Sequence, residues 1–492
     1  MKKAEVVFIP FPGVGHLVST LEFAKLLINR DNRLRVTVLV IKFPHSTETD
    51  VYTKSLPISD SLHVINLPEC SLPPNSDPVS ARKALLEAQK PNVKEAVSNL
   101  TTGAENGVLA AFVVDMFCTT MIDVAKEFSV PTLVFFTSGV AFLGLSLHLH
   151  TLRERDNVDS TQLQQLTELA VPSFTNLVPS KSLPSSVLRK EWESFMMDFW
   201  KGLKNADGFI VNSFEELESH AVHSFLSDPS LAGFPIYPAG PLLNLEPKTK
   251  GTVVSNDIIK WLDDQPPSSV VFLCFGSMGS FDEDQVKEIA CAIENSGARF
   301  IWSLRKPPPK GTMNIPPTDY TLSDLGSILP EGFLDRTAEI GRVIGWSPQT
   351  QILAHPATGG FASHCGWNST LESIYFGVPI ATWPLYAEQQ TNAFELVHEL
   401  KMGVEIALDY RVEFNGVPNY LVTADKIERG IRSVLDTDGE VRKNVKEMSE
   451  KSRKTLLEGG SSYTYLGRLI DYIMNQINNF HGDFGQEAYN HS

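Results

Sequence analysis

The chain has 492 residues, of which 42% are hydrophobic and 20% are charged, as in an ordinary soluble globular protein. This length exceeds what a single hydrophobic core normally serves, so we expect two domains of roughly 240 residues each. The formal net charge of −16 disfavours nucleic acids and anionic membranes as partners. We therefore expect that the chain binds neither; separately, a monomer is expected.

The five cysteines, at positions 70, 118, 274, 291 and 365, are widely spaced and form no CxxC pair. This spacing is typical of reduced thiols in a cytoplasmic protein rather than of a disulfide framework or a zinc site. Glu5 and Pro10 interrupt the first apolar run too early for a signal peptide. The uncharged segment 128–152 has the length of a membrane span. Pro131 and the interruption at 137–139 instead favour a buried strand and a core helix, so no stable membrane insertion is expected.

In the first half, apolar runs without alternation are separated by segments of helical spacing. Such runs are typical of parallel strands buried on both faces. Their alternation with helices predicts a doubly wound parallel sheet. The predicted strands are Glu5–Pro10, Val36–Ile41, His63–Leu67, Leu109–Val114, Thr132–Phe136 and Gly208–Val211.

A polar, aperiodic segment at 244–256 predicts a linker between domains at 1–243 and 257–460. The proline-rich segment 306–327 is interpreted as a surface loop with no element of its own. An amphipathic helix is expected at 461–478 and a disordered tail at 479–492. A second parallel sheet is predicted from strands at Val270–Phe275, Phe300–Leu304, Arg342–Gly345, Gly360–Ala362 and Val378–Thr382.

The segment Trp346–Gln389 contains a strand, a turn and a helix that suit a nucleotide. The strand breaks at Ser363-His364, and a Gly-Trp-Asn-Ser turn leads into a helix from about Thr370 to Phe376. A helix start offers unpaired N–H groups and a positive dipole end, which favour a diphosphate.

Side chains of this segment add to the diphosphate site. His364, Asn368 and Ser369 can donate to phosphate oxygens. Glu372 lies one turn beyond Asn368 and can accept from two ribose hydroxyls. The indole of Trp346 can stack on a flat base. Cys365 is not expected to act as a nucleophile, because the only base placed to activate it is His364, which the phosphates need.

The segment resembles the nucleotide-sugar box of plant family 1 UDP-glycosyltransferases. The resemblance rests on WSPQ at 346–349, HCGWNSTLE at 364–372 and the closing pair Glu388-Gln389, and it extends over nearly the whole chain. It implies an α/β fold of the GT-B class, in which two Rossmann-like, doubly wound parallel-sheet domains face each other across a cleft. It also implies that the helix at 461–478 braces the N-terminal domain.

The resemblance further implies a UDP-sugar site that needs no metal or other cofactor. Glu388 stands where family members commonly have Asp, which leaves its role of holding sugar hydroxyls plausible. Trp367 and the closing Gln389 look like a preference for glucose. The implied donor-site residues are Thr137, Ser277, Trp346, Ser347, Gln349, His364, Gly366, Trp367, Asn368, Ser369, Glu372, Tyr386, Glu388 and Gln389.

Asp282-Glu283-Asp284 has the form DxD, which holds a metal in other glycosyltransferases. It falls in the first turn of an expected helix at 282–295, where acidic residues interact well with the helix dipole. The capping interpretation is preferred, and no metal is expected. Ser277, in the small-residue turn before this helix, can donate to a phosphate.

The turn at 13–16 follows the first strand and opens a helix. A dinucleotide site would need a third glycine where Val18 stands. A neutral His16 at a helix N-terminus could instead be a general base. Asp115, which ends the fourth strand, could then fix its tautomer. Spacing alone leaves open that His16 is a turn residue and Asp115 a helix cap. The resemblance implies a catalytic His16–Asp115 pair, with Thr137 touching the transferred sugar.

Apolar residues of the first domain predict an acceptor site for a flavonoid or another phenolic compound, or else a triterpenoid. The predicted function is an inverting UDP-glucose-dependent O-glucosyltransferase, a hexosyltransferase of plant secondary metabolism. The alternatives are a catalytically silent UDP-sugar-binding protein, a nucleotide-sugar epimerase and a nicotinamide oxidoreductase. The predicted acceptor residues are Phe11, Gly13, Phe117, Val140, Phe142, Phe195 and Met196.

Overall fold

The computed structural model describes residues 3–43, 53, 59–70, 78–102, 107–245, 253–309, 315–412 and 416–487. The chain forms two compact units, each considered by itself. The first comprises Met1–Asn157, Glu191–Asn244 and Thr455–Ser492, and the second comprises Val158–Lys190 and Leu245–Lys454. Residues 158–190 therefore group with the second unit, whereas the sequence predicted them in the first domain.

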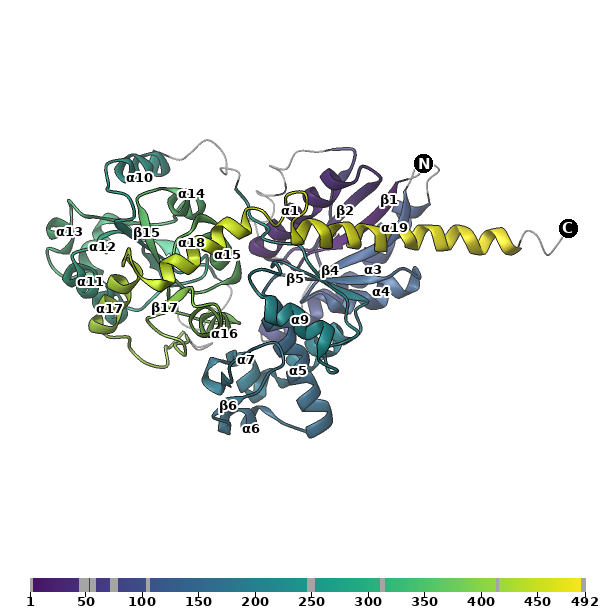
Figure 1. Cartoon of the computed structure of the whole chain (residues 1–492), viewed down its shortest axis with the longest axis horizontal. Helices are drawn as coiled ribbons and strands as arrows, with labels where there is room; N and C mark the ends of the chain where they lie inside the picture. Colours follow the sequence, from purple (N-terminus) through teal and green to yellow (C-terminus); the bar gives the residue numbers. More distant parts are fainter. Residues whose placement is uncertain are drawn as a thin grey trace. The chain divides into compact units, whose positions relative to one another are not determined.

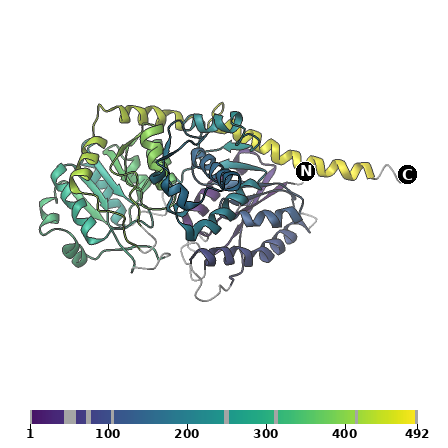
Figure 2. The same cartoon turned by 90° about the horizontal axis from the view of Figure 1, so that it is seen from below.

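Among the described residues, the first unit has one seven-stranded sheet in which all neighbouring strands are parallel. Its central strands β1 and β5 are fully buried and mostly apolar, because helices cover both faces (Figures 1 and 2). The strand order is β3 (Leu62–Asn66), β2 (Leu34–Val40), β1 (Ala4–Ile9), β4 (Val108–Asp115), β5 (Thr132–Phe136), β8 (Gly208–Val211) and β9 (Ile236–Pro238).

The helix α19 (Ser461–Glu487) runs along this sheet (Figure 1). Its residues Leu466, Leu469, Ile470 and Ile473 are buried in the same apolar cluster as β1, β2 and β4. The other helices of the unit are α1 (Val14–Arg30), α3 (Pro78–Thr101), η1 (Thr119–Met121), α4 (Ile122–Glu127), α5 (Val140–Asp156), η3 (Lys190–Trp192), α8 (Glu193–Lys204) and α9 (Ser219–Ser227).

The second unit has, within its described part, a six-stranded sheet of parallel neighbours. Its core lies between this sheet and the helices α11 (Glu283–Ser296) and α17 (Ala424–Val434), and it includes the fully buried Trp302 and Trp383. The strand order is β14 (Gly341–Ile344), β11 (Arg299–Ser303), β10 (Val270–Cys274), β15 (Thr358–Ser363), β16 (Ile380–Thr382) and β17 (Gly403–Glu405).

The helices of the second unit follow its strands, and two short antiparallel hairpins accompany them. The helices are α6 (Ser160–Gln165), η2 (Ser180–Ser182), α7 (Ser185–Leu188), α10 (Val253–Asp263), α11 (Glu283–Ser296), α12 (Leu322–Ile328), α13 (Phe333–Arg336), α14 (Gln349–Ala354), α15 (Trp367–Phe376), α16 (Gln389–Phe394), the π-helical η4 (Glu395–Glu399), α17 (Ala424–Val434) and α18 (Glu440–Ser452). The hairpins pair β6 (Glu168–Leu169) with β7 (Val178–Pro179) and β12 (Arg305–Lys306) with β13 (Thr318–Asp319).

Three expectations differ from these elements. The segment 306–327 was expected to lack structure, but it contains β13 and most of α12, whose N-cap Thr321 accepts from the Asp324 N–H. Helix α10 begins at Val253, inside the predicted linker; residues 246–252 of that linker lie outside the described residues. The predicted disordered tail at 479–492 is helical as far as Glu487, and the rest lies outside the described residues.

The strand order of each sheet reverses at one internal boundary. In the first sheet this is between β1 and β4, and in the second it is between β10 and β15. In open α/β sheets, ligands bind beyond the carboxyl ends of the strands at such a switch point. The topology therefore singles out the residues after β1 and β4, and those after β10 and β15. Among the described residues, no helix combines the length and the apolar character that a bilayer crossing requires.

Candidate functional site

The first switch point joins His16 to Asp115. His16 lies in the first turn of α1, and Asp115 is the last residue of β4. The His16 Nδ1 lies 2.7 Å from Asp115 Oδ2, and the Asp115 side chain is fully buried. Because a carboxylate only accepts, Nδ1–H is the donor, and in the neutral ring Nε2 then carries the lone pair. The His16 side chain is 26% exposed. This geometry orients the imidazole as a general base requires.

Two further groups fix this pair. The other Asp115 oxygen accepts from the Phe117 backbone N–H at 2.9 Å. The Thr137 hydroxyl lies 3.3 Å from His16 Nδ1. Thr137, predicted to touch the sugar, therefore lies beside the base, and its contact with a sugar stays a prediction. Asp115 orients the imidazole rather than simply capping the helical turn that begins at Thr119, for which no side-chain cap bond is present.

Aromatic rings surround His16. The ring centroid of His16 lies 5.5 Å from that of Phe11 and 5.7 Å from that of Phe117. Phe117 in turn contacts Phe195 and Phe199 on α8. An apolar wall beside the basic nitrogen suits a flat hydrophobic alcohol or phenol.

The predicted acceptor residues fall into two groups. Phe11, Gly13, Phe117 and Phe195 are partly exposed near His16 or in contact with its aromatic neighbours. In contrast, Val140, Phe142 and Met196 are buried side chains of α5 and α8. Their burial is what core packing requires, and their contact with an acceptor stays a prediction.

The second switch point contains His364, held between two glycines. A Cβ at Gly276 would lie 2.5 Å from the His364 Nε2, and a Cβ at Gly366 would lie 2.6 Å from it. Gly276 also has φ +76°, which favours glycine. Burial lowers the pKa of His364 to about 4, so this imidazole is neutral at neutral pH. It can offer an N–H to a phosphate, but no positive charge.

The helix after this turn starts three residues earlier than predicted. α15 begins at Trp367, so Asn368 and Ser369 lie in its first turn. The N-cap Gly366 makes no side-chain cap bond, and the first N–H groups of a helix have no intrahelical partners. A buried Trp367 side chain anchors the turn. The arrangement suits an anion at the helix start.

Cys365 has the left-handed φ of +61°, which is costly for a residue other than glycine. Its carbonyl accepts from Asn392 at 2.9 Å, and its N–H donates to the Ser363 hydroxyl at 3.2 Å. Burial raises the pKa of the Cys365 thiol to about 12. The thiol is thus protonated, in agreement with the expectation that it is not a nucleophile.

Gln349 connects the predicted phosphate and ribose residues. Its amide nitrogen donates to Ser369 Oγ at 2.9 Å and to Glu372 Oε2 at 2.7 Å. All three residues were predicted at the donor from the sequence, but the network between them was not. Ser347 is buried, with its hydroxyl 3.6 Å from the Cys274 sulfur, and Ser277 is exposed after β10.

The Gln389 amide is oriented by the backbone. Its Oε1 accepts from the N–H groups of Leu385 and Tyr386, at 2.9 and 3.0 Å. The Gln389 side chain also makes a hydrogen bond with the Tyr386 side chain, and contact of its NH2 group with a sugar hydroxyl stays a prediction. Burial raises the pKa of Tyr386 to about 12. Glu388, the N-cap of α16, follows Ala387, which has φ +57°.

Asp282 is a helix cap. Its carboxylate accepts from the Gln285 N–H at 3.1 Å at the start of α11, and Glu283 pairs with Lys287. This is the capping role preferred from the sequence. Within the described residues no group of three or more metal-ligating side chains is found, and independence of a metal stays a prediction.

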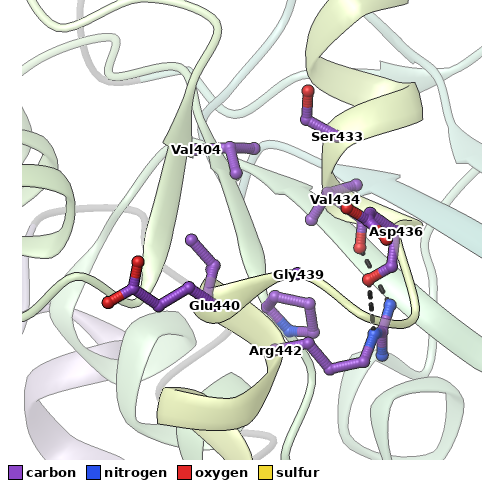
Figure 3. A pocket seen from close by; sticks show the side chains of 9 residues that line it. Val404, Ser433, Val434, Asp436, Gly439, Glu440 and Arg442 are labelled. Carbon is purple, nitrogen blue, oxygen red and sulfur yellow. Dashed lines mark hydrogen bonds between the residues drawn. The ribbon is translucent and has the colours of Figure 1, made fainter.

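A cavity of about 210 Å³ lies elsewhere in the second unit (Figure 3). Arg442 lines it, and the guanidinium donates to the carbonyls of Gly359, Val434 and Asp436. Gly359 is near the start of β15, and Pro379, also in the lining, precedes β16. The cavity is therefore at the amino ends of the strands, opposite to the switch point. None of its lining residues was predicted as a site residue.

Sequence reasoning missed several neighbours of the two sites. Phe199 lies one turn after Phe195 on α8, and this i, i+4 spacing was a usable signal. Phe43 contacts Phe11, but no periodic pattern marks it. Asp319 contacts Trp346 from the segment 306–327, which was interpreted as a loop with no element of its own, and Arg305 contacts Trp346 from the position just before that segment.

Comparison with known proteins identifies the class to which this fold and these sites belong. The family profile described as UDP-glucoronosyl and UDP-glucosyl transferase matches residues 250–414. The UDP-glucose flavonoid 3-O-glucosyltransferase 6 of Fragaria ananassa is 52% identical over 488 residues, covering 96% of this chain and 99% of that protein. The chain therefore belongs to the UDP-glycosyltransferase family.

Comparison with solved structures supports the same family assignment. A glycosyltransferase of Siraitia grosvenorii in complex with UDP matches with a TM-score of 0.86 and 48% identity, over 96% of this chain and 100% of that one. UGT71G1 of Medicago truncatula, complexed with UDP-glucose, matches with a TM-score of 0.84 and 39% identity, over 96% and 98% of the two chains. The predicted GT-B fold class is confirmed. The contribution of each site residue stays a prediction.

Proposed function

We propose that this enzyme is an inverting, UDP-glucose-dependent O-glucosyltransferase that forms a β-glucoside on a hydroxyl of a flavonoid or related phenol. The observation that carries the proposal is the 2.7 Å contact of the His16 Nδ1 with the buried Asp115. The relative from Fragaria ananassa is named for glucosyl transfer from UDP-glucose to flavonoids. The Medicago truncatula structure contains UDP-glucose.

The proposed reaction is one in-line displacement. His16 Nε2 accepts the proton of the acceptor hydroxyl as its oxygen forms a bond to the anomeric carbon. The bond from that carbon to the β-phosphate oxygen breaks, and UDP leaves with the electron pair. Attack from the side opposite UDP inverts the configuration. Asp115 stabilises the imidazolium that forms, and the base contributes about two to four orders of magnitude.

In the second unit, the proposed donor contacts are a stacked ring, hydrogen bonds and a helix dipole. Trp346 stacks on the uracil, Glu372 accepts from the ribose hydroxyls, and the start of α15 receives the diphosphate together with His364. Gln389 donates to a sugar hydroxyl through its NH2 group. Positioning of both substrates supplies much of the remaining acceleration, and we propose that no metal takes part.

The rings around His16 support a planar phenolic acceptor in preference to a triterpenoid. We also propose that the protein is cytoplasmic and a monomer. The location is supported by the five cysteines, which all lie within the described residues and are free.

The test is incubation with UDP-glucose and a panel of flavonoids, simple phenols and triterpenoids, read by mass for the gain of one hexose. The anomeric proton coupling of the product reports its configuration. UDP release without a glucosylated product, or an α-glucoside, would contradict the proposal. An altered sugar formed without any acceptor would indicate the epimerase instead.

A further inference from the structure

Trp346 is the most exposed aromatic side chain among the predicted donor residues. It follows β14 directly, and 58% of its surface is exposed. An indole in this setting would normally sample several rotamers. Ordering a rotamer-rich side chain when a ligand binds costs about 0.5–1.5 kcal/mol. A group that holds the ring beforehand would therefore strengthen nucleotide binding.

Such a group is present on the β12–β13 hairpin. The guanidinium carbon of Arg305 lies over the indole, 5.1 Å from its ring centroid. A cation over the face of a tryptophan ring is attracted to it. Arg305 itself is well ordered, because its side chain is only 10% exposed and also donates to the carbonyl of Pro317. One face of the ring is thus covered, which leaves the other for a base.

Asp319 links the arginine and the tryptophan. Its Oδ1 lies 2.9 Å from the Arg305 Nε and also accepts from the Trp346 backbone N–H at 3.0 Å. The same oxygen therefore fixes both the group on the ring and the backbone from which the ring projects. Gly345 makes room for this contact, since a Cβ there would lie 2.3 Å from the Asp319 Cγ.

Stability alone gives little reason for this arrangement. The Asp319 side chain is 55% exposed, and exposed ion pairs contribute only about 0–1 kcal/mol. Lys306, the next residue of the hairpin, makes a comparable ion pair with Asp324 at 3.0 Å and contacts the Tyr320 ring. Of these two ion pairs, the one formed by Arg305 contacts Trp346.

We infer that Arg305 and Asp319 are positioning residues for nucleotide binding: they hold the Trp346 indole by one face, so that its other face is ready for the uracil. The inference rests on the proposed stacking role of Trp346 and adds a role for the β12–β13 hairpin, most of which lies in the segment 306–327 that was interpreted as a surface loop. Neither residue needs to touch the nucleotide.

The test measures UDP and UMP affinity by calorimetry in the full-length enzyme. Arg305→Ala is expected to weaken the affinity for both nucleotides about three- to tenfold. Both nucleotides carry the uracil, and in either case its binding would then have to order the Trp346 ring. The KM for UDP-glucose should rise by a similar factor, with kcat and the acceptor KM changed less than twofold. Lys306→Ala is the matched control, since it removes one positive charge from the same hairpin, and it should change affinity less than twofold.

Coupling to the tryptophan gives the decisive readout. In a Trp346→Leu background, Arg305→Ala should have less than a twofold further effect, because there is no indole left to hold. If Arg305→Ala fails to fold, Gly345→Ala takes its place, as its Cβ displaces the Asp319 carboxylate and leaves Arg305 and Trp346 unchanged in sequence. It is expected to weaken UDP and UMP to the same extent.

Three results would overturn the inference. One is an equal loss of affinity from Arg305→Ala with and without Trp346. Another is a loss for UDP well above that for UMP, which would mean that the guanidinium contacts the diphosphate itself. Unchanged affinity in Arg305→Ala alongside a loss in Trp346→Leu would also overturn it, while the stacking role would stand. Unchanged UDP affinity in Trp346→Leu would instead remove the proposed role of the tryptophan.

Discussion

The two switch points have the same topology and opposite electrostatics. After β1 and β4, a partly exposed histidine is joined to a buried carboxylate. After β10 and β15, a histidine is buried between glycines, without a charged partner among the described residues, and its pKa is lowered to about 4. The first imidazole can gain a proton with a carboxylate to stabilise it. The second is kept neutral by burial.

This difference shows how the same residue type is assigned to different tasks. A general base needs an accessible lone pair and a counter-charge for the cation that it becomes. A donor to a phosphate needs only a fixed N–H, and burial fixes it. The roles of His16 and His364 follow from the neighbours of each ring rather than from its position after a strand.

The largest expected effect on this difference between the two histidines comes from removal of the His16 imidazole. His16→Ala is expected to lower kcat for an alcohol or phenol acceptor by about two to four orders of magnitude. UDP affinity, measured by calorimetry, should stay within twofold, because the proposed UDP contacts come from other residues.

Asp115→Asn gives the companion measurement. It keeps a hydrogen-bonding group of similar size beside His16 but removes the charge that stabilises an imidazolium, so kcat should again fall while UDP affinity holds. Near-wild-type turnover of either variant at neutral pH would mean that the assigned base is wrong.

Gly276→Ala tests the enclosed histidine. The new Cβ would meet the imidazole at 2.5 Å and would also adopt φ +76°. We expect kcat/KM for UDP-glucose to fall about ten- to hundredfold, since small displacements of a positioned group are costly. The backbone strain should lower the free energy of unfolding by about 1–2 kcal/mol.

Gly297→Ala is the matched control, because Gly297 has φ +63° and a Cβ added to it would meet no atom within 4 Å. It should show the same strain in thermal unfolding, with donor kinetics unchanged. Equal kinetic losses in the two variants would mean that contact with His364 does not matter.

The low pKa of His364 gives a pH-dependent stability with a defined sign. Between pH 6.5 and about 4, the unfolded chain binds a proton at this residue and the folded chain does not. Stability therefore falls as the pH falls through this window, by roughly 3 kcal/mol in all. Above pH 6.5 this residue should cause no change.

Urea unfolding of the native protein and of His364→Gln, at intervals from pH 7.5 to 4, measures this effect. The difference between the two free energies of unfolding cancels the other titrating groups. As the pH falls, the free energy of unfolding of the native protein should decrease relative to that of His364→Gln, by up to about 3 kcal/mol. A difference that does not vary with pH would show that the buried imidazole is protonated or exposed.

The strands were predicted from local apolar patterns, whereas the pairing of the site residues was favoured mainly by resemblance to a family. Buried apolar runs such as Thr132–Phe136 and Gly208–Val211 coincide with β5 and β8, since nothing but a parallel strand accommodates them. The His16–Asp115 pairing was left open by spacing and was favoured by resemblance. Its geometry comes from the adjacency of β1 and β4, a contact between distant parts of the chain.

Other features depended on tertiary packing that no local pattern reports. The short edge strands β9 and β17, of three residues each, carry too little periodicity to be recognised. The hairpin of Arg305 and Asp319 was hidden by its prolines. The earlier start of α15 was missed because Gly366 and Trp367 read as a turn, although the buried indole allows a helix there.

The smallest expected effect concerns Asp282, the N-cap of α11. Because Asp282 accepts from the Gln285 N–H, Asp282→Ala should cost about 1 kcal/mol of stability through the lost cap. Asp282→Asn, which can still cap, should cost much less.

Neither change should alter the KM for UDP-glucose, and a chelator should leave the activity of the native protein and of both variants unchanged. A donor KM that rises in both variants, or activity that chelation abolishes and Mg²⁺ or Mn²⁺ restores, would make this segment a metal ligand. The second site would then need a cation that the neutral surroundings of His364 do not supply.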